Sequence, residues 1–369
     1  MLKKTKNNCA LVFMLLLTLF NSFPLNVSAD EWYGESEKYY SVYLENKDKP
    51  LFMTAWEIAP RDEYLSSDNK LYRIYKVDGK NYKAYAKYVK NVKLPEVDMA
   101  EVTETAARQY TPKIGLLSTH SDESYLPSDG KASVNGRGGI YDVDEALKKG
   151  LENDGIDVML DKSIYLPHDA KAYSRSRSGV LNLVKKGAEV VFDIHRDAVP
   201  PEEYIRKIDG KNASGVRIVV GRANPNRKVN ADLAYKLKAV SDKLYPGMVK
   251  DIFFGHGSYN QDVGPNVLLL EFGTHTIHKE RAEMSATMFS NVINKALYGN
   301  DANNEKTPLG LVKSTPGQKK NVTRNIIVFL VVAAIGAGGF VFLSMGGKEW
   351  KSKIGNYFSG YFGRFKKQK

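Results

Sequence analysis

Two histidines and two glutamates have the types and spacing of a hydrolytic metal site. His120 and His195 each follow a short apolar run, and Glu271 ends a third one. Neutral imidazole is a good ligand for Zn²⁺, and Glu123, three residues after His120, adds a carboxylate oxygen. Three protein ligands leave the fourth position of a tetrahedral zinc ion open to water. The pattern therefore predicts a zinc site formed by His120, Glu123 and His195.

Glu271 is the candidate general base and acid. It follows the apolar run 267–270, where a carboxylate is costly to bury unless it has a charged neighbour or a catalytic role. Near the predicted metal, it would take a proton from the attacking water. The alternative is a structural salt bridge between Glu271 and Arg196 or another cation.

Other polar residues are candidates for positioning or for substrate contact. Asp193, Arg196 and Asp197 flank His195, where they could orient the imidazoles or bind carboxylates of a substrate, and both roles stay open. A second polar group follows a Gly-rich loop and either lines a cleft or forms an ordinary turn. Its members are Tyr259, Asn260 and Gln261.

Short apolar runs alternating with amphipathic stretches must position these side chains. Strands are predicted at 114–117, 156–160, 190–194, 216–220 and 267–272, and helices at 142–153, 175–186, 228–244 and 277–297. This alternation is typical of βαβ units, so we predict an α/β domain at residues 112–298, with a mostly parallel sheet flanked by helices. The His and Glu residues should converge at the carboxyl ends of the strands, where open α/β sheets bind ligands.

Three further segments surround the α/β domain. Residues 30–93 contain aromatic and β-branched runs separated by turn-like sequences, which predicts a small antiparallel β-rich domain. Residues 94–111 form a connector. Residues 299–324, rich in Asn, Lys, Pro and Gly, form a polar linker.

The two ends of the chain indicate export and membrane anchoring. Residues 1–29 begin with lysines, continue with an apolar run and end in residues with small side chains before the expected cleavage site. This order is typical of a cleavable secretory signal peptide. Residues 325–345 are long and apolar enough for one transmembrane helix. The tail 346–369 is basic and aromatic, which favours a cytoplasmic location. We expect a single-pass cell-membrane protein whose catalytic body is extracytoplasmic.

The positive charge of the chain is concentrated at its ends. The formal net charge is +12 at pH 7, of which the first six residues carry +3 and the tail 346–369 carries +6. The remaining +3 and the expected export argue against a nucleic-acid partner. Cys9 is the only cysteine and would be lost with the signal peptide, so any metal ligands must be His and carboxylates.

Five short motifs, in order over roughly residues 110–298, resemble the stage II sporulation protein P family. They are Thr-His-Ser-Asp-Glu-Ser-Tyr at 119–125, Tyr-Ser-Arg-Ser at 173–176, Phe-Asp-Ile-His-Arg-Asp at 192–197, Tyr-Asn-Gln-Asp at 259–262 and Leu-Glu-Phe-Gly at 270–273. The resemblance implies a zinc N-acetylmuramoyl-L-alanine amidase fold. It also implies cleavage of peptidoglycan, with an additional endopeptidase activity, in septal wall remodelling during engulfment.

The resemblance also implies residue roles and partners. His120, Glu123 and His195 match the metal positions of the family, and Glu271 matches its catalytic glutamate. Better-known zinc amidases take their carboxylate ligand from the start of the helix after the first strand, so Glu145 is the alternative to Glu123. The family usually has an amino-terminal anchor, unlike the carboxy-terminal span expected here. Stage II sporulation proteins D and M are the implied partners.

Two other functions fit the same residues. Another zinc peptidase acting on the stem peptide would use the same site, because the metal determines hydrolysis and not the substrate. A non-catalytic cell-wall-binding scaffold would keep the fold without the chemistry. The presence of both histidines, Glu123 and Glu271 favours an enzyme.

Overall fold

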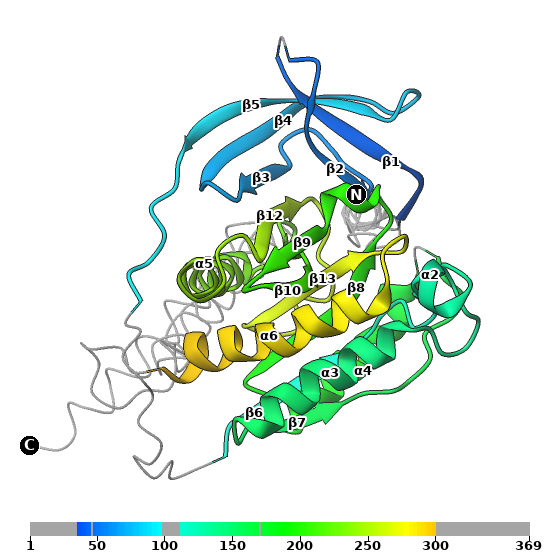
Figure 1. Ribbon diagram of the computed structural model, residues 1–369, viewed down its shortest axis with the longest axis vertical. Coiled ribbons are helices and arrows are strands. Elements are labelled where there is room, and N and C mark those ends of the chain that lie inside the picture. Colours follow the sequence, from blue (N-terminus) through cyan, green and yellow to red (C-terminus); the bar gives the residue numbers. More distant parts are fainter. Residues whose placement is uncertain (1–34, 46, 98–110, 170, 300–369) are drawn as a thin grey trace, which may run out of the picture. The chain divides into compact units, whose positions relative to one another are not determined.

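The computed structural model describes residues 35–45, 47–97, 111–169 and 171–299, which all belong to one compact unit (Figure 1). The predicted signal peptide 1–29, transmembrane helix 325–345 and tail 346–369 lie outside the described residues, as do most of the connector and nearly all of the polar linker. Among the residues that are described, no helix is both long and apolar enough to cross a membrane.

Six strands form the α/β half of the sheet. They are β6 (Lys113–Leu117), β7 (Asp157–Leu160), β8 (Val190–Asp197), β11 (Val216–Gly221), β12 (Val249–Gly255) and β13 (Val267–Thr274). Strands β7, β6, β8 and β13 are parallel neighbours, and β11 is parallel to β12. β11 and β13 are antiparallel, so the predicted α/β sheet is present but mixed. β12 lies outside the predicted strands because Lys250 and Asp251 interrupt its apolar pattern.

The five strands of the predicted β-rich segment continue the same sheet. They are β1 (Glu35–Leu44), β2 (Pro50–Trp56), β3 (Glu63–Ser66), β4 (Lys70–Asp78) and β5 (Lys83–Asn91). The full order is β2-β1-β5-β4-β3-β12-β11-β13-β8-β6-β7, with β3 antiparallel to β12. The prediction of purely antiparallel pairing is wrong for β1, which runs parallel to β5. Phe52 stacks on Tyr64 at 4.0 Å and packs near Phe253, so the apolar core continues across the junction.

Four long helices of the described chain pack on the α/β half. They are α3 (Ile140–Asn153), α4 (Ala172–Lys185), α5 (Arg227–Leu244) and α6 (Lys279–Tyr298), and shorter turns form α2 (Leu126–Asp129) and a 3₁₀ helix at Pro201–Glu203. In α3 the buried residues Val143, Leu147 and Leu151 have the spacing of an amphipathic helix. α3 and α6 lie side by side (Figure 1). Gly150 permits this contact, because a Cβ there would lie 2.4 Å from Oγ of Ser290.

A hairpin outside the predicted elements follows β8. It consists of β9 (Ile205–Ile208) and β10 (Lys211–Ser214), joined by Asp209 and Gly210. These two turn residues have φ of 49° and 74°, the left-handed conformations that a two-residue hairpin turn needs. The N–H of Gly215 donates to the Tyr204 carbonyl at 2.6 Å, so the hairpin holds the buried Tyr204 in place.

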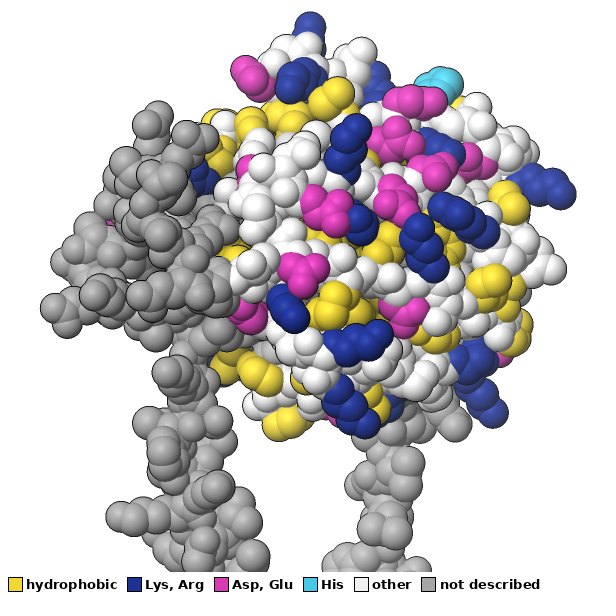
Figure 2. Space-filling view, turned by 90° about the horizontal axis from the view of Figure 1, so that it is seen from below, with side chains coloured by type: hydrophobic (Ala, Val, Ile, Leu, Met, Phe, Trp, Pro, Cys, Tyr) yellow, Lys and Arg dark blue, Asp and Glu magenta, His cyan; other side chains and the backbone are white. Residues whose placement is uncertain are grey.

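The charges on the described surface are mixed on the face seen from below. Figure 2 shows Lys and Arg side chains interspersed with Asp and Glu side chains over this face. This mixture agrees with the small net charge that the sequence leaves for the body of the chain.

Candidate active site

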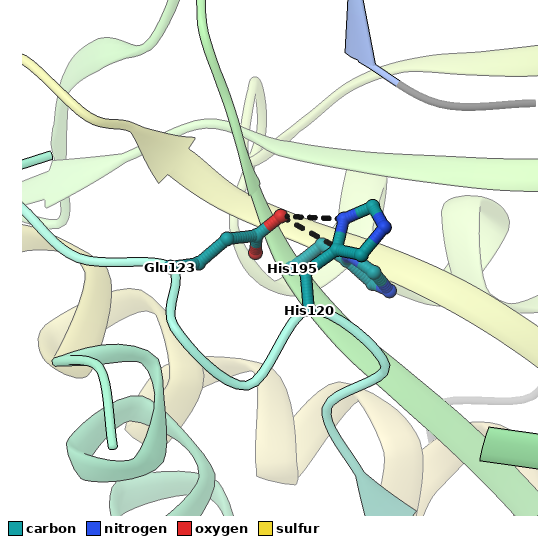
Figure 3. A group of neighbouring side chains, drawn as sticks. All are labelled: His120, Glu123 and His195. Carbon is teal, nitrogen blue, oxygen red and sulfur yellow. Dashed lines mark hydrogen bonds and ion pairs between the residues drawn. The ribbon is translucent and has the colours of Figure 1, made fainter. Parts of the chain in front are cut away.

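His120, Glu123 and His195 form one buried cluster (Figure 3). Nδ1 of His120 lies 3.1 Å from Oε1 of Glu123, and Nδ1 of His195 lies 3.3 Å from the same oxygen. One potential ligand atom from each residue lies within 4.8 Å of the others. All three residues are at most 2% exposed. The fold therefore brings together the three residues predicted as metal ligands.

The cluster forms where two neighbouring strands end. β6 and β8 are parallel, with Leu117 opposite Asp193, so the turn after β6 meets the carboxyl end of β8. Within this turn, the N–H of Glu123 donates to the His120 carbonyl at 3.1 Å. Gly138 lets the next loop pass directly against the turn, because a Cβ at Gly138 would lie 2.1 Å from the Glu123 carbonyl oxygen.

The donor atoms and their spacing fit a tetrahedral metal ion such as zinc. Two ligands at about 2.0–2.1 Å from such an ion are about 3.3 Å apart, which matches the separations of the two imidazoles from Oε1 of Glu123. Nε2 of His195 lies 3.0 Å from Oδ1 of Asp193, and carboxylates of this kind orient imidazole ligands. Nε2 of His120 and Nε2 of His195 are both buried without a hydrogen-bond partner among the described residues, although the latter lies within ion-pair distance of Asp193.

Burial and neighbouring charges set the protonation states of the cluster. Burial lowers the pKa of His120 to about 4, and His168 beside it acts in the same direction. Burial opposes the charge on Glu123, but His195 and His120 outweigh it and hold the pKa of Glu123 well below its usual value. Burial also opposes a charge on His195, but Asp193 and Glu123 outweigh it and hold the pKa of His195 well above its usual value. The cluster thus pairs an ionised Glu123 with a neutral His120, and binding of a metal at His195 would release a proton.

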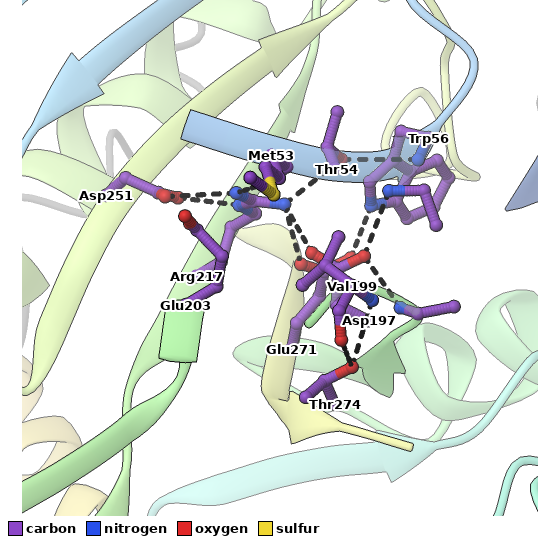
Figure 4. A network of polar contacts seen from close by, with 12 residues as sticks. Met53, Thr54, Trp56, Asp197, Val199, Glu203, Arg217, Asp251, Glu271 and Thr274 are labelled. Atoms are coloured by element: carbon purple, nitrogen blue, oxygen red, sulfur yellow. Dashed lines mark hydrogen bonds and ion pairs between the residues drawn. The ribbon is translucent and has the colours of Figure 1, made fainter. Parts of the chain in front are cut away.

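Glu271 lies on β13, directly opposite His195 on the parallel strand β8. Glu271 is 1% exposed, and its carboxylate accepts a hydrogen bond from the Trp56 indole N–H (Figure 4). It accepts a second one from the Tyr204 hydroxyl at 2.6 Å. Burial raises the pKa of Glu271 to about 8. A buried carboxyl with a pKa near neutrality suits a residue that accepts and returns a proton.

Arg217 is the cation beside Glu271. Its Nη1 lies 3.4 Å from Oε2 of Glu271 and 2.6 Å from Oδ2 of Asp197 (Figure 4). Its Nε lies 2.7 Å from Oδ1 of Asp251, so this guanidinium joins three buried carboxylates. The salt bridge predicted as the alternative role of Glu271 is therefore present, with Arg217 in place of Arg196. Asp197 belongs to this network and contacts neither imidazole of the cluster in any recorded hydrogen bond or ion pair.

A family model and one curated relative match this chain. The model for stage II sporulation protein P (SpoIIP) matches residues 36–294. The chain belongs to this family. Stage II sporulation protein P of Bacillus subtilis (strain 168) is 26% identical over 232 residues, which cover 56% of this chain and 58% of the relative. The family match includes β1–β5 as well as the α/β half, and the resemblance of the motifs is confirmed.

Solved structures of N-acetylmuramoyl-L-alanine amidases are similar to parts of this family member. The amidase from Clostridium difficile 630 is 14% identical with a TM-score of 0.34, and the match covers 53% of this chain and 99% of that chain. The CwlD amidase from Clostridioides difficile, in complex with the GerS lipoprotein, is 14% identical with a TM-score of 0.37. That match covers 52% of this chain and 100% of the amidase.

Arg196 contacts the cluster without being a ligand, and Glu145 lies apart from it. The Arg196 N–H donates to Oε2 of Glu123 at 2.9 Å, while its guanidinium donates to the carbonyls of Ser124 and Ala132. Arg196 therefore holds the turn that carries Glu123. Glu145 forms an ion pair with Lys162, and its side chain is 40% exposed. Glu123 is thus the carboxylate that the structure places in the cluster.

The polar residues 259–261 pack against elements that surround the site and are not in the metal-ligand cluster. The Tyr259 ring packs edge-on against Trp56 at 5.1 Å. Asn260 Nδ2 donates to the Tyr173 carbonyl at 2.9 Å. Gln261 donates to the Val219 carbonyl and accepts from the Gly221 N–H. Asn260 and Gln261 therefore hold the loop against α4 and β11.

Several residues at the site lie outside the predicted set. The His168 ring stacks on His120 at 4.0 Å, and its Nδ1 lies 2.9 Å from Oδ1 of Asp122. The Tyr173 ring lies 5.6 Å from that of His120. Tyr173 and Asp122 lie inside the family-like motifs, which is a usable signal. His168 lies in a loop and Trp56 comes from a distant strand, so spacing along the chain does not indicate either one.

Proposed function

We propose that this protein is a peptidoglycan hydrolase, a zinc-dependent N-acetylmuramoyl-L-alanine amidase that cleaves the amide between glycan and stem peptide. The observation that carries the proposal is the His120–Glu123–His195 cluster next to the buried Glu271. Membership of the stage II sporulation protein P family supports it.

His120, Glu123 and His195 would hold zinc, which when bound polarises the scissile carbonyl and lowers the pKa of water. Asp193 pairs electrostatically with His195, and the Arg196 N–H fixes the second oxygen of Glu123. These contacts limit rotation of the ligands before any ion binds.

Glu271 carries the proton. It accepts one from the attacking water and returns it to the amide nitrogen as the carbon–nitrogen bond breaks, so that the water oxygen ends on the new carboxylate. Trp56 and Tyr204 each donate to the Glu271 carboxylate and so fix its plane. Arg217 stabilises the ionised form of Glu271 that starts the cycle.

The proposed setting is septal wall remodelling during engulfment, with an additional endopeptidase activity on the peptides. The body would lie outside the cell membrane, anchored by the predicted span 325–345, with the tail in the cytoplasm. Stage II sporulation proteins D and M are proposed partners. These points rest on family membership and on the sequence of the two ends.

The test is cleavage of purified peptidoglycan by the full chain, with chelator and with added zinc, and with new amino termini identified by mass spectrometry. Zinc-restored termini beginning with L-alanine, and their loss in Glu271→Gln, are expected. Glu189→Gln, at the opposite end of β8, is the matched control and should cleave normally. Termini only within the stem peptide would indicate another zinc peptidase. Wall binding without any cleavage would indicate a scaffold.

A further inference from the structure

A groove of about 890 Å³ lies between the β-rich strands and the carboxyl ends of β8 and β13. One wall comes from β1 and the β4–β5 turn, with Tyr39, Lys80 and Lys83 among its residues. The other wall includes Arg196 and Thr276. Figure 1 shows β1 and β5 on the side of the molecule away from α3 and α6. The β-rich strands therefore help to form a surface at the active-site end of the sheet.

The described residues that line the groove carry a single sign of charge. Lys38, Lys80, Lys83 and Arg196 are among them, and none of these described lining residues is Asp or Glu. The nearest acid along the turn, Asp78, accepts hydrogen bonds from Asn81. This pattern contrasts with the mixed charges of the face in Figure 2. Several cations around one concavity attract and hold an anionic ligand.

The groove also offers aromatic rings and a buried hydroxyl. Tyr39 is 39% exposed, and Nζ of Lys38 lies 5.6 Å above the Tyr82 ring. Thr276 lines the groove, and its Oγ1 is buried without a hydrogen-bond partner among the described residues. Rings beside cations suit a strand that alternates sugar faces with carboxylates.

The residues of the groove adjoin the proposed catalytic residues. Arg196 follows His195 in β8, and Thr276 lies five residues after Glu271. The His275 N–H donates to the Asp197 carbonyl at 3.1 Å, which ties the two strand ends together. A ligand in the groove would therefore extend from the same strand ends that carry His195 and Glu271.

We propose that this groove binds the carboxylates of an anionic glycopeptide strand, and that Lys80 and Lys83 are its accessible cationic contacts. The inference rests on the proposed function, because it assigns to the same site a preference for wall polymers whose stem peptides keep free carboxylates. It also gives the β-rich strands a role in substrate binding.

The experiment measures binding, so it does not depend on cleavage. The full chain carrying Glu271→Gln is titrated with purified peptidoglycan stripped of phosphate polymers, either native or with its carboxylates amidated. The variants are Lys80→Glu with Lys83→Glu, the milder Lys80→Gln with Lys83→Gln, and a control with Lys90→Glu and Lys185→Glu. The control changes two exposed lysines outside the groove by the same charge.

Reversal of the groove charges should weaken binding to native peptidoglycan on the order of tenfold, and the neutral pair by a smaller factor, with the control unchanged. Amidation of the wall should weaken wild-type binding to the level of the charge-reversed variant and affect that variant little. Equal effects of the groove and control variants would overturn the proposal. So would a loss that persists on amidated wall, or one that appears only on wall that retains phosphate polymers. If the binding results were as expected but the wild type cleaved no peptidoglycan, the proposed amidase activity would be wrong and the proposed binding role of the groove would stand.

Discussion

Trp56, the last residue of β2, donates its indole N–H to the carboxylate of Glu271, 215 positions later in the chain. The strands predicted as a small separate unit thus reach the candidate catalytic residue directly. The neighbouring Ala55 N–H donates to Oδ1 of Asp197 at 3.1 Å, so two consecutive residues of β2 contact the same network.

Trp56→Phe should move the acidic limb of the pH–rate profile toward higher pH. The donor stabilises the ionised form of Glu271, so its removal raises the pKa of this residue, by about one unit if the hydrogen bond contributes about 1.4 kcal/mol. At neutral pH, less of the base is then ionised and the rate falls. Tyr64→Phe, a buried change away from Glu271, is the control. An unchanged limb in Trp56→Phe would show that the hydrogen bond does not tune the base.

Removal of any residue of the metal cluster should remove the bound ion. We expect about one zinc per purified chain, and less than about a tenth of that in His120→Ala, Glu123→Gln or His195→Ala. The measurement is metal analysis by mass spectrometry after dialysis. His278→Ala is the control, because the side chain of His278 is 68% exposed. Equal zinc in all four variants would place the metal elsewhere.

Glu271 should also make the stability of the metal-free protein depend on pH. Its pKa is about 8 in the folded state against an ordinary 4.5, so the folded state binds more protons between these values. Stability should therefore fall as pH rises through this window, and Glu271→Gln should remove that part of the slope. Above pH 8 the Gln variant should be more stable, on the order of 5 kcal/mol, because the pKa of Glu271 is raised by about 3.5 units at about 1.4 kcal/mol each. Urea denaturation at pH 5 and pH 8.5 tests this, and parallel slopes in the two proteins would contradict it.

The sequence predicts the parts of the site that depend on neighbouring strands. His120, His195 and Glu271 follow or end apolar runs. Parallel pairing brings the ends of neighbouring strands together regardless of the length or sequence of the loops between them. The contacts of Trp56 depend instead on the pairing of β3 with β12, which no local pattern encodes. Arg217, like Glu271, is a single charged residue in an otherwise apolar strand. The sequence pattern therefore allows Arg217 to be predicted as a site residue in the same way as Glu271.

Arg217→Met should be strongly destabilising. The guanidinium is fully buried between the carboxylates of Glu271, Asp197 and Asp251, so its loss leaves buried negative charges without a counterion. The expected loss in the free energy of unfolding is about 3–5 kcal/mol. Arg73→Met is the control, because Arg73 is 53% exposed in its pair with Glu63 and should cost less than about 1 kcal/mol.

Urea denaturation of both arginine variants at pH 7 gives the comparison. Arg217→Lys should recover only part of the loss, because an ammonium group cannot reproduce the planar fork that contacts Asp251 through Nε and Asp197 through Nη1. Equal losses in the free energy of unfolding for Arg217→Met and Arg73→Met would contradict the prediction. They would show that the buried network around Arg217 stabilises the protein no more than an exposed ion pair does.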